Sequence, residues 1–409
     1  MPQPVRISLM PGVWLTAIQT RKFKSSRWSL RLLTPLRRET ASMTALLPRV
    51  LRQGTAREPD GQRLGAALER LCGGTAVPTV QRAGEIQAAG FQAAFPADAL
   101  TPDGGSTLRR AAELLGDLLL RPATRNGRLR GDYLDRARES LFAALERERY
   151  EEARDPVLRL RREMCAAEPA GISPLGDAKR AAAIRVGRLD RHYRAWLEES
   201  WLELYYCGAA EPDRAAQAWT EALMGLPRRG RAELPEPQVD VHPKEVRTVQ
   251  VPAARGDRLA LGFRTLTGAD SPDEPALLVL CALFTGLEDG LCAQLDRHKG
   301  LLLVSADTES GRMDERQAEL LAQLERLRDG AFSPGALERA RGAVTERLRG
   351  AQDSPEALMR YYTPLPPRIS PEELEALVQE TGRADVARAA ERLELDTVCQ
   401  FPGRGGEEV

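Results

Sequence analysis

Two stretches of this chain have similar sequence patterns. They lie on either side of a segment that can continue neither a helix nor a strand. That segment is Leu226–Pro237, which is rich in proline and charge and indicates a linker. Before it, an apolar helical run opens at Ala45-Leu46-Leu47 and ends near Gly54. After it, a similar run opens at Ala276-Leu277-Leu278 and ends near Gly286. The sequence therefore predicts two halves derived from one duplicated unit.

A second pair of segments repeats in the same order. The pattern Leu-x-Ala-x-Leu, an acidic residue, Arg, two further residues and Gly occurs at 64–73 and again at 291–300. Its offset between the halves is nearly that of the first pair, and two matches in register favour duplication over chance. We therefore expect an N-terminal domain at 1–225, a linker at 226–245 and a C-terminal domain at 246–409.

Each half begins with residues typical of paired strands and then becomes helical. The strand patterns lie at 13–33 and at 247–265. Ser-Pro pairs at Ser271, Ser333 and Ser370 mark helix starts, and Ser370 with Glu373 matches a capping box. Strands mixed with helices at both ends of a half predict an α+β fold, in which helices pack on one side of a mixed sheet.

Composition and charge exclude several classes of protein. The 409 residues contain 59 Lys plus Arg and 59 Asp plus Glu, so no global positive field attracts nucleic acid. No run of about eighteen apolar residues is present to span a membrane, and residues 1–8 lack the pattern of a secretory signal. The six cysteines are far apart and lie mostly among apolar neighbours, which indicates reduced thiols in a cytoplasmic protein.

Several short motifs, taken in order, extend over nearly the whole chain. They lie at Val13–Thr20, Phe23–Trp28, Thr34–Leu36, Leu64–Gly73, Arg159–Cys165, Glu168–Ile172 and Leu393–Val398. In this order they resemble the insulinase/pitrilysin-type peptidase family, in particular its non-catalytic branch associated with 5-aminopentanol modification of elongation factor P. The resemblance implies two homologous α/β roll domains joined by a linker, in a processing-peptidase-like architecture.

The resemblance also locates the positions of a zinc site. Active members have His, Glu and His at the positions that correspond to 45, 48 and 49, because two ligands and a general base must share one helix face. Here Ala45 and Pro48 have no ligand atoms, and Arg49 is a permanent cation that would repel zinc. We expect an N-terminal domain without zinc ligands.

No other set of residues assembles a metal centre or a nucleophile. Catalytic zinc recruits clustered ligands, whereas the histidines are scattered, and they give no Ser-His-Asp or Cys-His signature. A charged surface face is the simpler explanation for the glutamates of the helix expected at 132–152, where the third ligand would lie. We expect neither a metal nor another cofactor. The residues considered are His192, His242, His298, Glu139, Glu146 and Glu148.

In active relatives the second half supplies an Arg and a Tyr to substrate binding. Arg297 fits the Arg position, and the Tyr position holds Leu303, or Leu302 if the register differs by one. Arg49 and Arg297 are therefore the candidate contacts for a peptide or partner, because a guanidinium suits bidentate recognition of a carboxylate.

Arg297 also has a simpler explanation as a surface ion pair with Asp296 or Glu288. An exposed Arg297→Glu change is then expected to leave the fold intact. After 305–311 the chain passes directly into a helical pattern at Asp314. This predicts that the second half lacks a strand of the family, with consequences for peptide binding by strand addition at that edge.

The leading hypothesis is a non-catalytic subunit that pairs with an active zinc-peptidase homologue as a heterodimer and helps to hold a peptide or protein substrate. A role in elongation factor P modification or in peptide processing follows from the resemblance. The alternatives are a stand-alone peptide-binding or scaffold protein and, third, an active metallopeptidase with an unrecognised site. A partner interface above about 1,000 Å² is expected, as is usual for specific complexes.

Overall fold

The chain folds into two compact units that interleave along the sequence. The computed structural model describes residues 3–97, 107–228, 233–251 and 256–403. Each unit includes a segment from the other half of the chain, and one change of unit, at Pro235, falls within the region expected as a linker. The first unit comprises Met1–Leu145, Ile172–Pro235 and Gln352–Pro366, and the second comprises Glu146–Gly171, Glu236–Ala351 and Pro367–Val409.

A six-stranded sheet organises the first unit. Its order is β1-β2-β8-β3-β5-β4, in which β2 and β8 are parallel and the other neighbours are antiparallel. A small hairpin of β6 and β7 forms a separate sheet. The strands are β1 (Val5–Met10), β2 (Val13–Gln19), β3 (Ser25–Pro35), β4 (Thr75–Ala83), β5 (Ile86–Pro96), β6 (Thr124–Arg125), β7 (Arg128–Leu129) and β8 (Trp201–Gly208).

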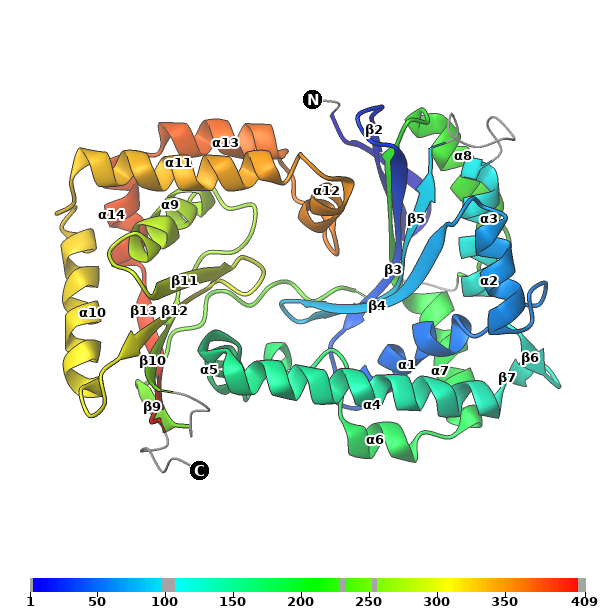
Figure 1. Ribbon diagram of the computed structural model, residues 1–409, viewed down its shortest axis with the longest axis horizontal. Coiled ribbons are helices and arrows are strands. Elements are labelled where there is room, and N and C mark those ends of the chain that lie inside the picture. Colours follow the sequence, from blue (N-terminus) through cyan, green and yellow to red (C-terminus); the bar gives the residue numbers. More distant parts are fainter. Residues whose placement is uncertain (1–2, 98–106, 229–232, 252–255, 404–409) are drawn as a thin grey trace. The chain divides into compact units, whose positions relative to one another are not determined.

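The helices bury an apolar core against one face of this sheet, along which Figure 1 shows α3 and α8. On β3, Trp28, Leu30 and Leu32 belong to that core, whereas Ser29 and Arg31 alternate to the opposite face. The helices are α1 (Ala41–Leu51), α2 (Gly61–Glu69), α3 (Thr107–Leu120), α4 (Gly131–Arg154, whose last residues belong to the second unit), α6 (Ala178–Ala183), α7 (Val186–Glu199), α8 (Pro212–Ala222) and α12 (Pro355–Tyr362).

A five-stranded sheet organises the second unit, in the order β11-β12-β10-β13-β9 with only β13 and β9 parallel. Helices α11 and α13 lie side by side and contact α9 (Figure 1). The elements are β9 (Arg247–Gln250), β10 (Asp257–Arg264), β11 (Leu291–Asp296), β12 (Leu301–Thr308), β13 (Glu394–Phe401), α5 (Pro156–Met164), a 3-10 turn (Pro169–Gly171), α9 (Glu274–Thr285), α10 (Met313–Arg328), α11 (Pro334–Gly350), α13 (Pro371–Glu380) and α14 (Arg383–Glu391).

The expected helix starts are largely confirmed. The Ala336 N–H donates to Ser333 Oγ at 3.1 Å at the start of α11. Ser370 and Glu373 form the capping box of α13. Helix α9 begins at Glu274, a short distance after Ser271.

The two sheets repeat one topology. The order β2-β8-β3-β5-β4 in the first unit corresponds to β9-β13-β10-β12-β11 in the second, including the single parallel pair. One expectation about this topology is wrong: the two strands within 13–33, β2 and β3, do not pair with each other, and neither do β9 and β10 within 247–265. A late strand inserts between them, β8 in the first unit and β13 in the second, because each unit's last strand returns to the centre of its sheet.

The second sequence match between the halves does not align equivalent elements. Residues 64–69 lie in the helix α2, whereas 291–296 form the strand β11. Asp60 caps α2, and Leu64, Ala67 and Leu68 are buried at helical spacing. Residues 291–296 instead pair along β12, which satisfies their backbone groups in a sheet. A Leu-x-Ala-x-Leu pattern fits both periods, so the duplication rests on topology and not on this match.

The main sheet of the second unit does have one strand fewer than that of the first, but the expected position of the loss is wrong. The chain runs from β12 directly to α10, just as it runs from β5 to α3 with no strand in the described part of that connection. The element without an equivalent is β1, which lies at the opposite edge of the first sheet. Strand β11 therefore occupies an edge in the same way as β4 does.

Each sheet is also covered on its second face by a helix from the other half of the sequence. Helix α5 packs on β10, β12 and β13, where Leu160 and Met164 contact Leu303 and Cys399 in a small apolar cluster. Helix α12 packs on β3 and β8 in the same manner. Because β10 corresponds to β3 and β13 to β8, the two halves exchange equivalent helices.

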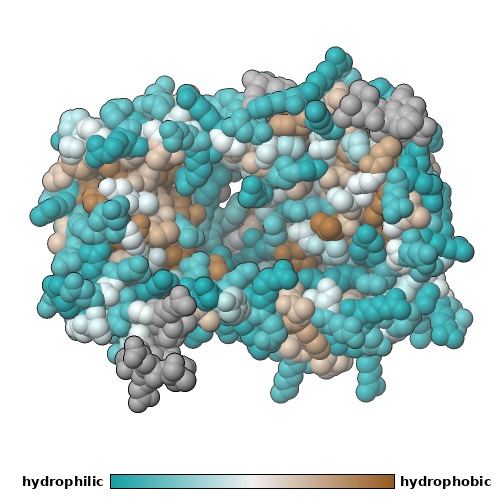
Figure 2. Space-filling view, viewed as in Figure 1, coloured by the Kyte–Doolittle hydropathy of each residue, from teal (hydrophilic) through white to brown (hydrophobic). Residues whose placement is uncertain are grey.

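The surface is predominantly hydrophilic on the face shown in Figure 2. Large apolar residues are exposed singly, such as Val77 at 51% and Met224 at 71%, which is normal for globular proteins. Among the described residues, no helix combines the length and the apolar character needed to cross a bilayer.

Candidate functional site

Helix α1 carries the three positions expected to be degenerate, and it is packed into the core. Ala45 is fully buried and Pro48 is buried inside the helix, while Arg49 is half-buried. Arg49 Nη1 donates to the Ala45 carbonyl at 2.8 Å, so its side chain lies along its own helix. Burial lowers the pKa of Arg49. None of these three side chains offers a lone pair to a metal ion.

The structure brings one histidine to this helix, which its distance in sequence did not predict. His192, on α7, has Nε2 2.9 Å from Thr44 Oγ1, the residue before Ala45. Burial, with a smaller contribution from Arg188, lowers the pKa of His192 to about 4, so the imidazole is neutral at pH 7. A single neutral imidazole beside a hydroxyl is not a zinc site, because three protein ligands are needed.

The remaining candidate ligands lie elsewhere. His242 contacts Glu394 at 2.7 Å, and hydrogen bonding to that carboxylate raises the pKa of His242. On α4 the side chains buried in the core are apolar, as at Ala137 and Leu141, whereas Glu139 and Glu146 are exposed. Within the described residues, no three His, Cys, Asp or Glu side chains cluster as metal ligands do.

Arg297 lies in the turn between β11 and β12, and it pairs with a carboxylate that was not among the expected ones. It forms an ion pair with Glu274 at the start of α9. The side chains of Arg297 and Glu274 are 24% and 3% exposed, so the pair is not a surface pair. Leu303, at the Tyr position, is 3% exposed in the core beneath α5. The premise of an exposed Arg297 is therefore wrong, and we now expect Arg297→Glu to destabilise the fold, since it would place two carboxylates together at the buried Glu274.

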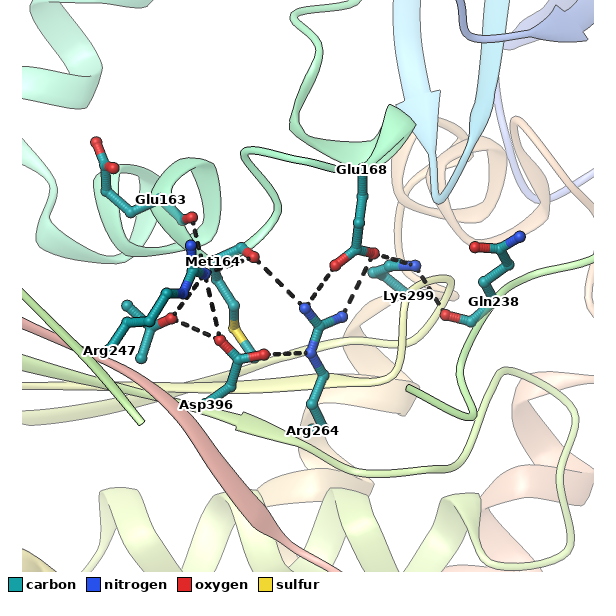
Figure 3. Close-up of polar contacts among 9 residues, drawn as sticks. Glu163, Met164, Glu168, Gln238, Arg247, Arg264, Lys299 and Asp396 are labelled. Atoms are coloured by element: carbon teal, nitrogen blue, oxygen red, sulfur yellow. Dashed lines mark hydrogen bonds and ion pairs between the residues drawn. The ribbon is translucent and has the colours of Figure 1, made fainter. Parts of the chain in front are cut away.

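Buried charges of the second unit form one connected network (Figure 3). Arg264, on β10, donates to Asp396 at 2.8 Å and to Glu168 at 2.6 Å. Lys299 Nζ lies 2.6 Å from Glu168 Oε2 and donates to the Gln238 carbonyl at 2.7 Å. Arg264 and Lys299 are only 2% and 1% exposed. Each of these buried cations therefore has a carboxylate partner, which such charges require.

The same network anchors the segment that follows α5. Arg247 donates to the carbonyls of Glu163 and Met164 at 3.1 and 3.0 Å (Figure 3). Burial favours a raised pKa for Glu168, but hydrogen bonds from Arg264 and Lys299 outweigh it and the pKa is lowered. Glu168 and Asp396 lie within the motifs at 168–172 and 393–398, but their cationic partners are far away in the chain, so the sequence did not single them out. The network gives those motifs a structural role.

The comparisons with known proteins agree with this geometry. Residues 183–344, less than half of the chain, match the family model described as "Peptidase M16 inactive domain". The protein named "Probable inactive metalloprotease YmfF" of Bacillus subtilis is 23% identical over 97% of each chain.

Solved structures share the fold over the whole length. A conserved protein of Enterococcus faecalis superposes with a TM-score of 0.82 at 21% identity, over 99% of this chain and 100% of that one. A peptidase M16 inactive domain of Pseudomonas fluorescens gives 0.72 at 15% identity, with 100% of both chains covered. Residues 183–344 are thus similar to a domain described as an inactive M16 peptidase domain, the whole chain is similar to a probable inactive metalloprotease, and it shares the fold of M16-like proteins.

Proposed function

We propose that this protein is the non-catalytic subunit of a two-protein peptidase, in which a partner with an intact His-x-x-Glu-His motif supplies the zinc chemistry. The observation that supports the proposal is the contrast between the lost zinc positions of α1 and the retained fold. All three zinc positions are occupied by residues without ligand atoms, while the fold around them is retained in both units. A chain that cannot hold the metal but keeps both sheets retains the means to bind a peptide or a partner.

Two features support a binding role. The outer edge of β4 lies next to the helix with the degenerate positions, because α1 packs on β4 and β5. Arg49, on that helix, is half-buried with Nη1 bonded only to its own helix. We propose Arg49 as a contact for a peptide or partner carboxylate. Arg297 remains a proposed contact only because 24% of its side chain is exposed; its guanidinium already pairs with Glu274.

We further place the protein in the cytoplasm. Its six cysteines are free thiols, and Cys72 and Cys292 are exposed, a state that a reducing compartment maintains. Participation in elongation factor P modification belongs to the same proposal and rests on the resemblance of the motifs.

Co-purification from the native source tests the proposal directly. A tagged chain should retain an intact zinc-peptidase homologue in equimolar amount through size-exclusion chromatography. A charge-neutralising surface variant, Glu346→Gln on α11, is a suitable control because Glu346 is exposed. Recovery of the chain alone, from cells that express such a homologue, would contradict pairing and favour a stand-alone peptide-binding or scaffold protein.

A further inference from the structure

One buried cation of the first unit has no counterion among the described residues. Three cationic side chains are buried in the described part of the chain, Arg31, Arg264 and Lys299. The latter two share the carboxylate of Glu168, and Arg264 also has Asp396. Arg31 is 1% exposed and forms no ion pair with any described carboxylate. A buried charge without a partner is costly and therefore unusual.

The side chain of Arg31 is held in place by one contact. Arg31 lies at the centre of β3, directly opposite Gly90 on β5, which has no side chain to cover. Its Nη1 passes beyond that glycine and donates to Gln81 Oε1, on β4, at 2.6 Å. A Cβ at Gly90 would lie 2.0 Å from the Leu30 carbonyl, so the glycine is required by close strand packing as well.

The other two nitrogens of the guanidinium are the unsatisfied ones. Nε and Nη2 are buried and have no hydrogen-bond partner in the structure. These two N–H groups lie on the same edge of the guanidinium and point in the same direction. Together they can donate two parallel hydrogen bonds to one carboxylate. In Arg264, the corresponding Nε and Nη2 contact Asp396 and Glu168.

The nearest acidic neighbour by strand register does not serve Arg31. Glu203, on β8, is directly opposite Arg31. Its carboxylate instead accepts from Arg6 Nη2, on β1, at 2.7 Å and from Trp201 Nε1, on β8, at 2.6 Å. On the same face as Arg31, Ser29 Oγ is also buried without a partner. Burial lowers the pKa of Arg31 to about 10, so the group remains charged at neutral pH.

The exposure of this face increases from Arg31 toward the edge strand β4. Thr79 is opposite Gly90 and therefore on the face of Arg31, as are Val77 and Gln81 at period two. Val77 is 51% exposed, and Thr79 and Gln81 are half-buried. We infer that Arg31 is a receptor for a carboxylate of a bound peptide, which enters past β4 and pairs with Nε and Nη2. The inference rests on the proposed peptide-binding role and names the chemistry of the peptide.

The test measures peptide binding to the isolated chain by calorimetry. Three alanine-based hexapeptides, each acetylated, serve as probes: one with a free C-terminal carboxylate, one amidated, and one amidated with a central Glu. We expect at least one carboxylate peptide to bind about tenfold more tightly than the neutral one, and the two acidic probes distinguish a C-terminus from a side chain. Equal affinity for all three, or no binding of any, would overturn the inference.

Variants then assign any preference to Arg31. Arg31→Met should abolish the preference without lowering the unfolding temperature, because it removes an unpaired buried charge. Arg125→Met, at an exposed arginine of the same unit, should change neither quantity. Retention of the preference in Arg31→Met would overturn the inference.

A second variant tests the inference even if Arg31→Met does not fold. Gln81→Glu supplies an internal carboxylate to the same guanidinium, so it should raise the unfolding temperature and weaken the carboxylate preference. An unchanged preference in Gln81→Glu would contradict the assignment. Since no partner is present in these assays, failure of the two-subunit proposal leaves their outcome unaffected.

Discussion

We expect the loss of the Glu168 carboxylate to destabilise the second unit, because this one side chain pairs with two buried cations. Its carboxylate contacts Arg264 and Lys299, each at 2.6 Å, and both cations are almost completely buried. Glu168→Gln keeps the shape and removes the charge, which leaves Lys299 with only the Gln238 carbonyl. Breaking a buried ion pair by removing one partner typically costs about 3–5 kcal/mol. For a unit of this size, each kcal/mol lowers the midpoint by roughly 2–4 °C, so a fall of about 6–20 °C is expected.

The pH dependence of this loss has a definite sign. The pKa of Glu168 is lowered in the folded state, so its stabilisation is present above the unfolded pKa of about 4.3 and is lost as the pH falls through the folded pKa. The difference between the wild type and Glu168→Gln should therefore be constant near pH 7 and shrink below about pH 4.3. Thermal unfolding followed by calorimetry at several pH values measures both effects. Glu346→Gln, on the exposed face of α11, should stay within about 0.5 kcal/mol of the wild type. A Glu168→Gln midpoint within about 2 °C of the wild type would refute the assigned role of the network.

Three further outcomes follow from the site. The purified chain should contain less than about a tenth of an equivalent of zinc, and Arg49→His should not create hydrolysis, because a working site needs three ligands and a base; stoichiometric zinc by atomic emission together with chelator-sensitive cleavage would contradict this. The imidazole of His192 should titrate near pH 4 by NMR, and because its folded pKa is lowered from 6.5 to about 4, it should contribute a loss of stability as the pH falls across that window; a normal titration near 6.5 would show that the ring is solvated. Arg297→Glu should destabilise the chain by about 3–5 kcal/mol in chemical denaturation, because it faces the buried Glu274; an unchanged midpoint would restore the expectation of a simple surface position.

The local features of the fold could be predicted from the sequence because their causes are local. Ser370 and Glu373 are three residues apart, so the capping box was visible in the sequence. The absence of ligand atoms at Ala45 and Pro48 is likewise a property of single residues. These predictions needed no knowledge of which segments meet in space.

The errors arose where tertiary pairing decides between local alternatives. The pattern at 291–296 fits helix and strand equally, and pairing along β12 selects the strand. The insertion of β8 between β2 and β3 depends on a chain segment about 170 residues later, so adjacency in sequence misled. The exchange of α5 and α12 has the same origin, since both depend on contacts between distant segments.

Arg31 was missed although a signal was present. Along β3 the polar residues Arg27, Ser29 and Arg31 alternate with Trp28 and Leu30, which predicts a strand with one polar face. The sequence could not indicate that this strand is central and that its polar face is buried. Only the strand order and the exposures reveal that a cation there has no carboxylate partner among the described residues.

We propose that this protein contributes to catalysis only through a partner. The most direct measurement titrates the chain into an intact zinc-peptidase homologue from the same organism and follows hydrolysis of an unstructured fluorogenic peptide. We predict no hydrolysis by the chain alone, and an increase in the partner's rate that saturates at one equivalent. Hydrolysis by the chain alone, or a hydrolysis rate of the partner that is unchanged at all ratios, would contradict the proposed two-subunit peptidase.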